Sequence, residues 1–387
     1  MAKREFDFKD KLSFHAEWFD FNSYYQKKFV INYYPSDNTL DIFDRELNRM
    51  YLKRSKMEGV EMKDMFVGNT VRIYGRQIKI TDYADCRTLR YVGKSKERTL
   101  AILKPGAVDK LGEIITHIQH RQFQITKLSM CLLNRKEALD FYESSKGDPS
   151  LPFILENIVS GPVVALELVG ENALERWKET MGPAEPVEAR KVAPDSLRAL
   201  YGLESSVTNG FHGSETHQDV ARESSFFFPQ ASTRTPPESP VQLKNTTCCI
   251  IKPHAIRDGN LGHVITYITD SHFKVSAAKM TYLSNANADE FLEVYKGVVS
   301  DYNALLLSFL DGPCVALEIA GKHDDVNAHE EFRKFVGPSD SDIARQIRPD
   351  TLRARFGCDK YKNAAHCTDL PEDTVLELEY FFKVLRD

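Results

Sequence analysis

The chain has 387 residues, of which 42% are hydrophobic and 28% are charged, and its formal net charge is −5. This length allows two or three domains of ordinary globular composition. Residues 1–91 carry a net charge of +3 and the remainder −8, values that do not indicate a nucleic-acid-binding protein.

No apolar run approaches the roughly 18 residues of a membrane span, and the first residues do not form a signal peptide, so we expect a cytoplasmic protein without membrane contact. The seven cysteines have no metal-ligand spacing, so we expect no protein-held metal.

The first 91 residues alternate aromatic and polar side chains in short runs. Examples are 28–34, 71–74 and 78–83, which are separated by segments rich in Asn, Gly and Pro. This pattern is typical of strands joined by tight turns. We therefore predict a small β-rich domain over residues 1–91.

The remainder of the chain contains one long unit twice. Residues 99–105 (TLAILKP) match 247–253 (TCCIIKP), and 161–167 (GPVVALE) match 312–318 (GPCVALE). The offset between the copies grows only from 148 residues at the Lys-Pro pairs to 154 at the last matched histidines, so the copies are whole domains. We divide this part into a first repeat at 98–229, a Pro-rich linker at 230–245 and a second repeat at 246–387. The prolines of the linker lack sheet or helix partners and predict an extended spacer.

Each repeat reads as strand, helix, strand, helices, strand, helix and then an irregular loop that carries a histidine. In the first repeat the strands are predicted at 100–103, 124–132 and 163–168, with a helix that starts near residue 109. The economical fold class is α+β, with a β-α-β-β-α-β sheet and helices on one face. Because the two repeats share these patterns, we expect them to pack as a pseudo-two-fold pair.

The polar residues that recur in both repeats suit phosphate chemistry. Lys104 and Arg198 offer positive charge and hydrogen-bond donors to phosphate oxygens, although no P-loop is present. A histidine in a Gly-rich loop is usually structural, but the recurrence of Lys, Arg and Asn with it favours His212 and His366 as nucleophiles. Seven other histidines have no counterpart and are expected on the surface, namely His117, His120, His254, His263, His272, His323 and His329.

Both repeats resemble the nucleoside diphosphate kinase family. The family's loop reads N-x-x-H-G-S-D, and the repeats have Asn209-Gly-Phe-His212-Gly-Ser-Glu215 and Asn363-Ala-Ala-His366-Cys-Thr-Asp369. The resemblance implies a ferredoxin-like sheet in each repeat. Residues 1–91 are similar to the DM-ten domain of axonemal and centrosomal proteins.

The resemblance implies a ping-pong reaction in which a nucleoside triphosphate, bound with Mg²⁺, phosphorylates the histidine and a diphosphate then collects the group. The implied nucleophiles and their carboxylate partners are His212 with Glu223 and His366 with Glu377. The implied nucleotide-binding residues are Lys104, Tyr142, Lys178, Arg198 and Asn209 in the first repeat and Lys252, Tyr295, Arg333, Arg353 and Asn363 in the second.

Several positions depart from the family pattern. Lys178 replaces an arginine and loses its fork of donors, Ala184 replaces a threonine, and the aromatic that stacks on the base falls at Ser150. In the second repeat Cys367 stands where a glycine is expected. If that glycine provides a left-handed backbone or a close backbone approach, a Cβ there strains the loop. The nucleotide clamp between Tyr295 and Gly312 is two residues shorter than its counterpart. We therefore expect weak activity, mainly in the first repeat.

Two functions compete on these grounds. The first is a structural protein of the ciliary or flagellar axoneme, its doublet microtubules and the centrosome, in which a kinase-like scaffold retains phosphohistidine chemistry at His212. Its partners would be tubulin, other doublet proteins and the gamma-tubulin complex. The alternative is a fully active nucleoside diphosphate kinase.

Overall fold

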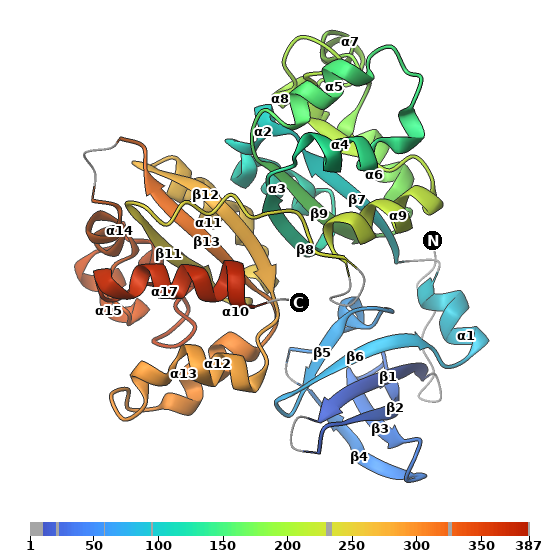
Figure 1. The fold of residues 1–387 in the computed structure, drawn as a ribbon. Coiled ribbons are helices and arrows are strands. Elements are labelled where there is room, and N and C mark those ends of the chain that lie inside the picture. Colours follow the sequence, from blue (N-terminus) through green and yellow to red (C-terminus); the bar gives the residue numbers. More distant parts are fainter. Residues whose placement is uncertain are drawn as a thin grey trace. The chain divides into compact units, whose positions relative to one another are not determined.

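A computed structural model describes residues 11–20, 23–57, 59–93, 96–229, 234–323 and 327–385. It contains two compact units, Met1–Glu97 with Leu310–Gly312, and Arg98–Phe309 with Pro313–Asp387. Figure 1 shows the fold of each unit. None of the described helices is both long enough and apolar enough to cross a lipid bilayer.

The N-terminal unit is built on one antiparallel sheet in the order β4-β3-β2-β1-β6-β5. Alternate residues of β2, Phe29, Ile31 and Tyr33, are fully buried, because successive side chains of a strand point to opposite faces. The predicted β-rich domain is confirmed. Its elements are β1 (Leu12–Asp20), β2 (Tyr25–Tyr34), β3 (Thr39–Asp44), β4 (Arg49–Lys56), β5 (Thr70–Ile73), β6 (Arg76–Tyr83) and α1 (Cys86–Thr88).

The second unit contains both repeats. The first repeat has β7 (Glu97–Leu103), α2 (Pro105–Val108), α3 (Leu111–His120), β8 (Gln124–Cys131), α4 (Arg135–Phe141), α5 (Leu151–Ile158), β9 (Val163–Gly170), α6 (Ala173–Met181), α7 (Pro186–Val192), α8 (Leu197–Tyr201), β10 (Phe211–Gly213) and α9 (His217–Phe227). The second has β11 (Thr246–Ile251), α10 (Pro253–Arg257), α11 (Leu261–Thr269), β12 (Phe273–Thr281), α12 (Asn285–Phe291), α13 (Tyr302–Leu310), β13 (Cys314–Gly321), α14 (Ala328–Val336), α15 (Ser341–Ile347), α16 (Leu352–Phe356), β14 (Ala365–Cys367) and α17 (Thr374–Glu379).

The strand order within each repeat is ferredoxin-like. The first repeat places its strands in the order β10-β7-β9-β8, which is fourth, first, third, second along its own chain. The second repeat has the mirrored list β12-β13-β11-β14. The predicted fold class is confirmed, and the histidine segments, predicted as irregular loops, form a fourth strand of three residues in each repeat. A strand this short has no readable hydrophobic period, so its sequence resembled a loop.

The two repeats join through β8 and β12 into one sheet of eight strands, with Ser129 opposite Lys279. Helices α3 and α11 also pack together, and Gly112 and Gly262 lie at their crossing. A Cβ on Gly112 would lie 2.4 Å from the Thr266 backbone nitrogen, and one on Gly262 would lie 2.5 Å from that of Thr116. The reciprocal contacts match the expected pseudo-two-fold pair and depend on two residues without side chains.

We expect Gly112→Ala to lower the free energy of unfolding by about 1–3 kcal/mol, because the new methyl group overlaps backbone atoms that cannot rotate away. Thermal unfolding measures this change. Gly106→Ala is the matched control, since its Cβ would lie 3.6 Å from the Leu203 side chain, an ordinary contact. Equal stability of the two variants would contradict the close approach of α3 and α11.

The linker follows a more specific path than a free spacer. Residues 230–233 lie outside the described residues, but the backbone N–H of Leu132 on the β8 side donates to the Glu238 carbonyl over 2.8 Å. The backbone N–H groups of Gln242 and Leu243 donate to the buried carboxylate of Glu318 on β13. The prolines themselves lie in no strand or helix, as expected, but Glu238 makes one isolated bridge to Leu132, and the Glu318 carboxylate binds the segment further along.

Candidate phosphohistidine site

The first histidine is held on the short strand β10. His212 lies opposite Ile102 of β7, and Lys104 follows directly after that strand. The Lys104 backbone N–H also donates to the Gly210 carbonyl over 2.8 Å. Residues about a hundred positions apart in the sequence are thereby fixed at one end of the sheet.

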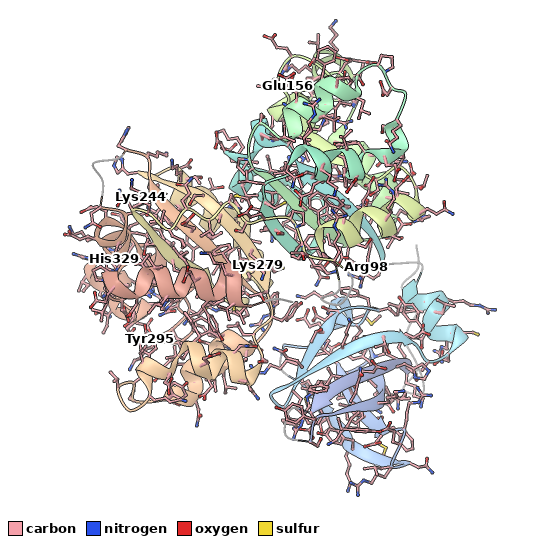
Figure 2. The ribbon with its side chains drawn as sticks, in the orientation of Figure 1. Arg98, Glu156, Lys244, Lys279, Tyr295 and His329 are labelled. Carbon is pink, nitrogen blue, oxygen red and sulfur yellow. The ribbon has the colours of Figure 1, made fainter. Side chains whose placement is uncertain are left out.

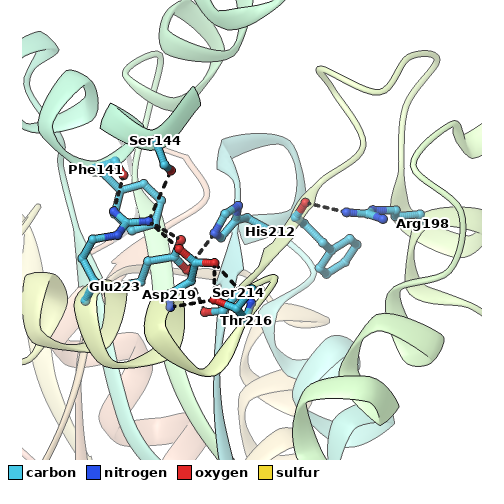
Figure 3. A network of polar contacts seen from close by, with 10 residues as sticks. Phe141, Ser144, Arg198, His212, Ser214, Thr216, Asp219 and Glu223 are labelled. Atoms are coloured by element: carbon cyan, nitrogen blue, oxygen red, sulfur yellow. Dashed lines mark hydrogen bonds and ion pairs between the residues drawn. The ribbon is translucent and has the colours of Figure 1, made fainter. Parts of the chain in front are cut away.

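His212 is bound by a buried carboxylate. Its Nε2 lies 3.1 Å from Oε2 of Glu223 on α9, and the Ser214 hydroxyl donates to the same oxygen over 2.7 Å, as Figure 3 shows. The other carboxylate oxygen, Oε1, accepts from Arg222 over 3.0 Å. Glu223 is buried rather than solvated as a helix-face glutamate would be. A neutral imidazole that donates from Nε2 keeps its lone pair on Nδ1.

The second repeat contains the same arrangement. Nε2 of His366 lies 3.1 Å from both carboxylate oxygens of Glu377 on α17, and the Thr368 hydroxyl donates to Oε2 over 2.7 Å. The His366 side chain is only 7% exposed, whereas that of His212 is 19% exposed. The second histidine is therefore less accessible.

The buried lysine of the first repeat contacts the asparagine of the histidine loop in the same repeat. Lys104 Nζ donates to Asn209 Oδ1 over 3.1 Å and to the Val207 carbonyl over 3.4 Å. Burial, together with the charge of Arg198, lowers the pKa of Lys104 to about 8. The asparagine in turn donates from Nδ2 to the carbonyl of Ala184 over 3.1 Å. At neutral pH the lysine is mostly charged and lacks a carboxylate in these contacts.

In the second repeat the lysine keeps the equivalent backbone partner and exchanges the asparagine for a serine. Lys252 Nζ donates to the Tyr361 carbonyl over 2.8 Å and to the Ser308 hydroxyl over 3.2 Å. Burial, together with the charge of Arg353, lowers the pKa of Lys252 to about 7. Asn363 donates to the Ser339 carbonyl over 2.8 Å, but within the described ranges its buried Oδ1 has no hydrogen-bond partner.

The arginines predicted to bind phosphate donate hydrogen bonds to backbone carbonyls of the histidine segments and of the preceding loops. Arg198 Nη1 donates to the Gly182 carbonyl over 2.8 Å, and Nη2 to the Phe211 carbonyl over 3.4 Å. Arg353 makes the equivalent bonds to the carbonyls of Gly337 and Ala365, at 2.9 and 3.0 Å. Burial lowers the pKa of Arg198, whose Nε has no partner among the described residues. Each arginine orders the loop before any ligand arrives.

The remaining predicted residues differ between the repeats. The Tyr142 ring lies 5.6 Å from that of His212, and its buried hydroxyl has no partner in the described chain. Lys178 Nζ donates to the Glu215 carbonyl over 2.9 Å. In the second repeat the Tyr295 hydroxyl, labelled in Figure 2, donates to Asp369 Oδ2 over 2.5 Å, and Arg333 also binds this carboxylate.

Of the two reasons for expecting strain at Cys367, a left-handed backbone is contradicted, whereas a close approach is found at its counterpart Gly213. Cys367 and its counterpart Gly213 both have backbones outside the left-handed region. The left-handed residues are Gly210, with φ +80°, and its counterpart Ala364, with φ +68°. Gly213 is needed for space instead, since a Cβ there would lie 2.5 Å from Trp177.

His254 was expected on the surface and is buried. Its Nε2 accepts from the Ala364 backbone N–H over 3.1 Å, and burial lowers the pKa of His254 to about 4. A neutral His254 therefore braces the left-handed residue of the second loop. Its counterpart in the first repeat is Gly106, so this brace is specific to the second repeat.

Sequence reasoning did not identify several residues of the two sites. Ser214 and Thr368 could have been identified from the sequence, because a residue with a hydroxyl group stands two positions after the histidine in each repeat. Asp369 and His254 depend on where a side chain points in the folded protein, which spacing does not reveal. Ser150 occupies the N-cap position of α5 without a capping hydrogen bond from its side chain, and the exposed aromatic of that helix is Phe153.

The model of the family described as "Nucleoside diphosphate kinase" matches residues 97–233 and 245–386, and that of the DM10 domain matches 3–87. The chain belongs to the nucleoside diphosphate kinase family. It is 46% identical over 376 residues to Nucleoside diphosphate kinase homolog 7 of Rattus norvegicus, and 45% identical over 376 residues to that of Mus musculus. Both alignments cover 97% of this chain and 94% of the relative. The Aquifex aeolicus nucleoside diphosphate kinase structure has 37% identity and a TM-score of 0.34, covering 36% of this chain and 99% of that one.

Proposed function

We propose that the first repeat forms a phosphohistidine at His212 with a nucleoside triphosphate as donor, and that the chain carries this kinase scaffold into ciliary and centrosomal microtubule structures. We also propose that the chain consists of domains at residues 1–91, 98–229 and 246–387, with a linker at 230–245. The observation that carries the chemistry is the bond between His212 Nε2 and the buried carboxylate of Glu223, at 3.1 Å.

This bond selects the nucleophilic atom. With Nε2–H donated to Glu223, the lone pair on Nδ1 attacks the γ-phosphorus, and the bond to the bridging oxygen breaks as the nucleoside diphosphate leaves with that electron pair. The ring becomes cationic as the new bond forms, and the carboxylate stabilises it. An incoming diphosphate reverses these steps.

Substrate charge is met by Lys104, Arg198 and Lys178. The hydroxyl of Tyr142, which has no partner among the described residues, is a further donor beside the histidine. Among the described residues, no group of three or more His, Cys, Asp or Glu side chains could hold a metal ion. We propose that Mg²⁺ enters as part of the substrate, bridging phosphate oxygens and neutralising their charge.

The direct test is incubation of the purified protein with γ-labelled ATP, followed by separation of acid-labile from acid-stable phosphate. We expect acid-labile label that chases onto added nucleoside diphosphate. Rapid and complete transfer would favour a fully active nucleoside diphosphate kinase, because both repeats keep the histidine–glutamate pair. Absence of acid-labile label at saturating ATP would refute the catalytic half of the proposal.

We expect ADP affinity to depend on pH through the buried lysines. Bound phosphate favours the charged form of Lys104 and raises its pKa from about 8, so binding takes up a proton above that pH and the Kd increases by up to about tenfold per pH unit. For Lys252 the same increase begins near pH 7. Calorimetric titration between pH 6.5 and 9.5 measures it. Lys104→Arg should remove the increase from the first site, and an unchanged Kd in the unaltered protein would contradict the assignment.

The structural half of the proposal rests on the N-terminal unit, which is similar to a DM-ten domain and carries exposed aromatics and cations. Tyr24 is 83% exposed, and Phe19 and Tyr25 are also exposed. Lys27 and Arg76 lie over the Trp18 ring, at 5.0 and 5.1 Å from its centroid. Such a surface suits an acidic partner, and we propose tubulin, including doublet and gamma-tubulin assemblies.

Deleting residues 1–91 should abolish incorporation into axonemal doublets and basal bodies while leaving histidine phosphorylation unchanged. Localisation of tagged protein in ciliated cells measures the first effect, and acid-labile label the second. The double variant Lys27→Glu/Arg76→Glu tests the surface within the full chain and should weaken microtubule co-sedimentation. A truncated protein that still enters the axoneme would refute this role for the domain.

A further inference from the structure

Arg222 joins the carboxylate partner of His212 to the helix that packs on the histidine ring. On α9, Arg222 Nη2 donates to Glu223 Oε1 over 3.0 Å and lies 3.3 Å from Asp219 Oδ1. Its Nη1 donates over 2.8 Å to the carbonyl of Phe141, the last residue of α4. Figure 3 shows these partners around the site, and the Phe141 ring is centred 5.2 Å from that of His212. Arg222 therefore contacts both the carboxylate and the aromatic residue beside the imidazole.

The two oxygens of Glu223 have separate partners because of this contact. Arg222 binds Oε1, and Oε2 lies 3.1 Å from His212 Nε2. In the second repeat the residue before Glu377 is Leu376, whose side chain is apolar and 66% exposed. There both carboxylate oxygens lie 3.1 Å from the histidine Nε2. The second repeat thus shows how the pair is arranged without this arginine.

The arginine also reduces the negative charge that the histidine experiences. A guanidinium bound to a carboxylate offsets part of its charge, and Glu223 is buried, where water screens such an interaction weakly. A phosphorylated ring is cationic, so it is stabilised most by a carboxylate whose charge is not shared. Because the Arg222 side chain is 41% exposed, we expect a moderate effect rather than a large one.

We propose that Arg222 is a positioning residue of the first site, which holds one oxygen of Glu223 away from His212 and thereby limits the stabilisation of the phosphohistidine. This inference rests on the proposed function. An intermediate that is stabilised too strongly faces a higher barrier in its next step, here the transfer to a nucleoside diphosphate. Arg222 thus favours turnover in the first repeat, and the second repeat lacks this contribution.

Arg222→Leu introduces the second repeat's residue into the first site and tests the inference in the full-length chain. His366→Gln is included in every protein compared, so that acid-labile label reports His212 alone. At a fixed ratio of ATP to ADP, we expect the equilibrium ratio of phosphorylated to free His212 to rise by about two- to fivefold, the size typical of a partly exposed charge pair. Transfer of the group to ADP should slow by a similar factor. Arg222→Lys keeps a cation beside Glu223 and should leave the ratio nearly unchanged.

The hydrogen bond itself is measured without phosphotransfer, by NMR of the chain that retains both histidines and carries isotope-labelled histidine. In Arg222→Leu the Nε2 signal of His212 should approach that of His366, since both oxygens of Glu223 become available to the ring. Leu376→Arg is the reverse exchange and should move the His366 signal toward that of His212. In each variant the other histidine is the internal control, and thermal unfolding verifies that the protein is folded.

The outcomes separate this inference from the proposed function. If the unaltered protein forms no acid-labile label, the proposed phosphotransfer fails, whereas convergence of the two Nε2 signals in Arg222→Leu still supports control of Glu223 by the arginine. An unchanged Nε2 signal in folded Arg222→Leu protein overturns the inference whatever the label shows. A phosphorylated ratio that does not rise, with only a slower approach to equilibrium, would show a purely structural role and overturn it as well.

Discussion

Replacing His212 with Gln is expected to lower acid-labile labelling from γ-labelled ATP by at least about 100-fold. The side-chain amide of Gln can still hydrogen-bond to Glu223, so the buried carboxylate keeps a partner, but no nucleophilic nitrogen remains. His212 is the more exposed of the two histidines, at 19% against 7% for His366. Its loop also places a glycine, Gly210, at the left-handed position.

The matched control is His366→Gln, which should retain most of the label. Rings lie equally close to the two histidines, with Phe141 centred 5.2 Å from His212 and Phe291 5.3 Å from His366. In the second site, however, Asp369 occupies two donors. Label that survives His212→Gln and disappears with His366→Gln would reverse the assignment. Unfolding temperatures of both variants distinguish lost chemistry from lost structure.

The internal repeat made the fold and much of the candidate site predictable. Two copies of one pattern locate equivalent strands, and the recurring Lys, Asn, His and Glu were predicted to contribute to one site in each repeat. The histidine–glutamate pairs, at 3.1 Å in both repeats, lie 11 residues apart in sequence and were expected as partners. Their catalytic roles remain predictions.

Details that depend on tertiary contacts were not predictable. Lys104 and Lys252 both donate to the carbonyl two residues before the loop asparagine, yet the second partner is Asn209 for Lys104 and Ser308 for Lys252. This difference arises from side-chain positions in the surrounding helices. The burial of His254 was not predicted, because this histidine has no counterpart in the first repeat. Its sequence position does not show that the ring accepts a hydrogen bond from a backbone N–H.

Cys367 is a departure from the family pattern, as predicted, but it does not strain the backbone of its loop. The prediction of strain gave two reasons for a glycine at this place, a left-handed backbone or a close approach, and the first of them does not hold here. The structure indicates a steric reason instead, because Gly213 lies against Trp177 and Met181. Both neighbours are smaller in the second repeat, where Phe332 and Val336 occupy the equivalent helix positions and share a core with Cys367. The cysteine is accommodated by its surroundings.

This compensation predicts a large effect when the cysteine is moved alone. Gly213→Cys should lower the free energy of unfolding by about 1–3 kcal/mol or more, since its Cβ would lie 2.5 Å from Trp177 Cδ1 and 2.6 Å from Met181 Cε. Histidine phosphorylation should fall with it, because Gly213 is the next residue after His212 on β10. Chemical denaturation and acid-labile label measure the two effects.

Adding Trp177→Phe and Met181→Val to Gly213→Cys recreates the second repeat's residues and should recover a substantial part of the lost stability. The effects of residues in contact deviate from additivity by about 0.5–3 kcal/mol. The triple variant should therefore lose less free energy of unfolding than the sum of the losses for the separate changes. The helix variant Trp177→Phe/Met181→Val without the cysteine is the control, and it should be destabilised because it leaves a cavity. Strictly additive effects would show that Gly213 is required for a reason other than the space taken by Trp177 and Met181.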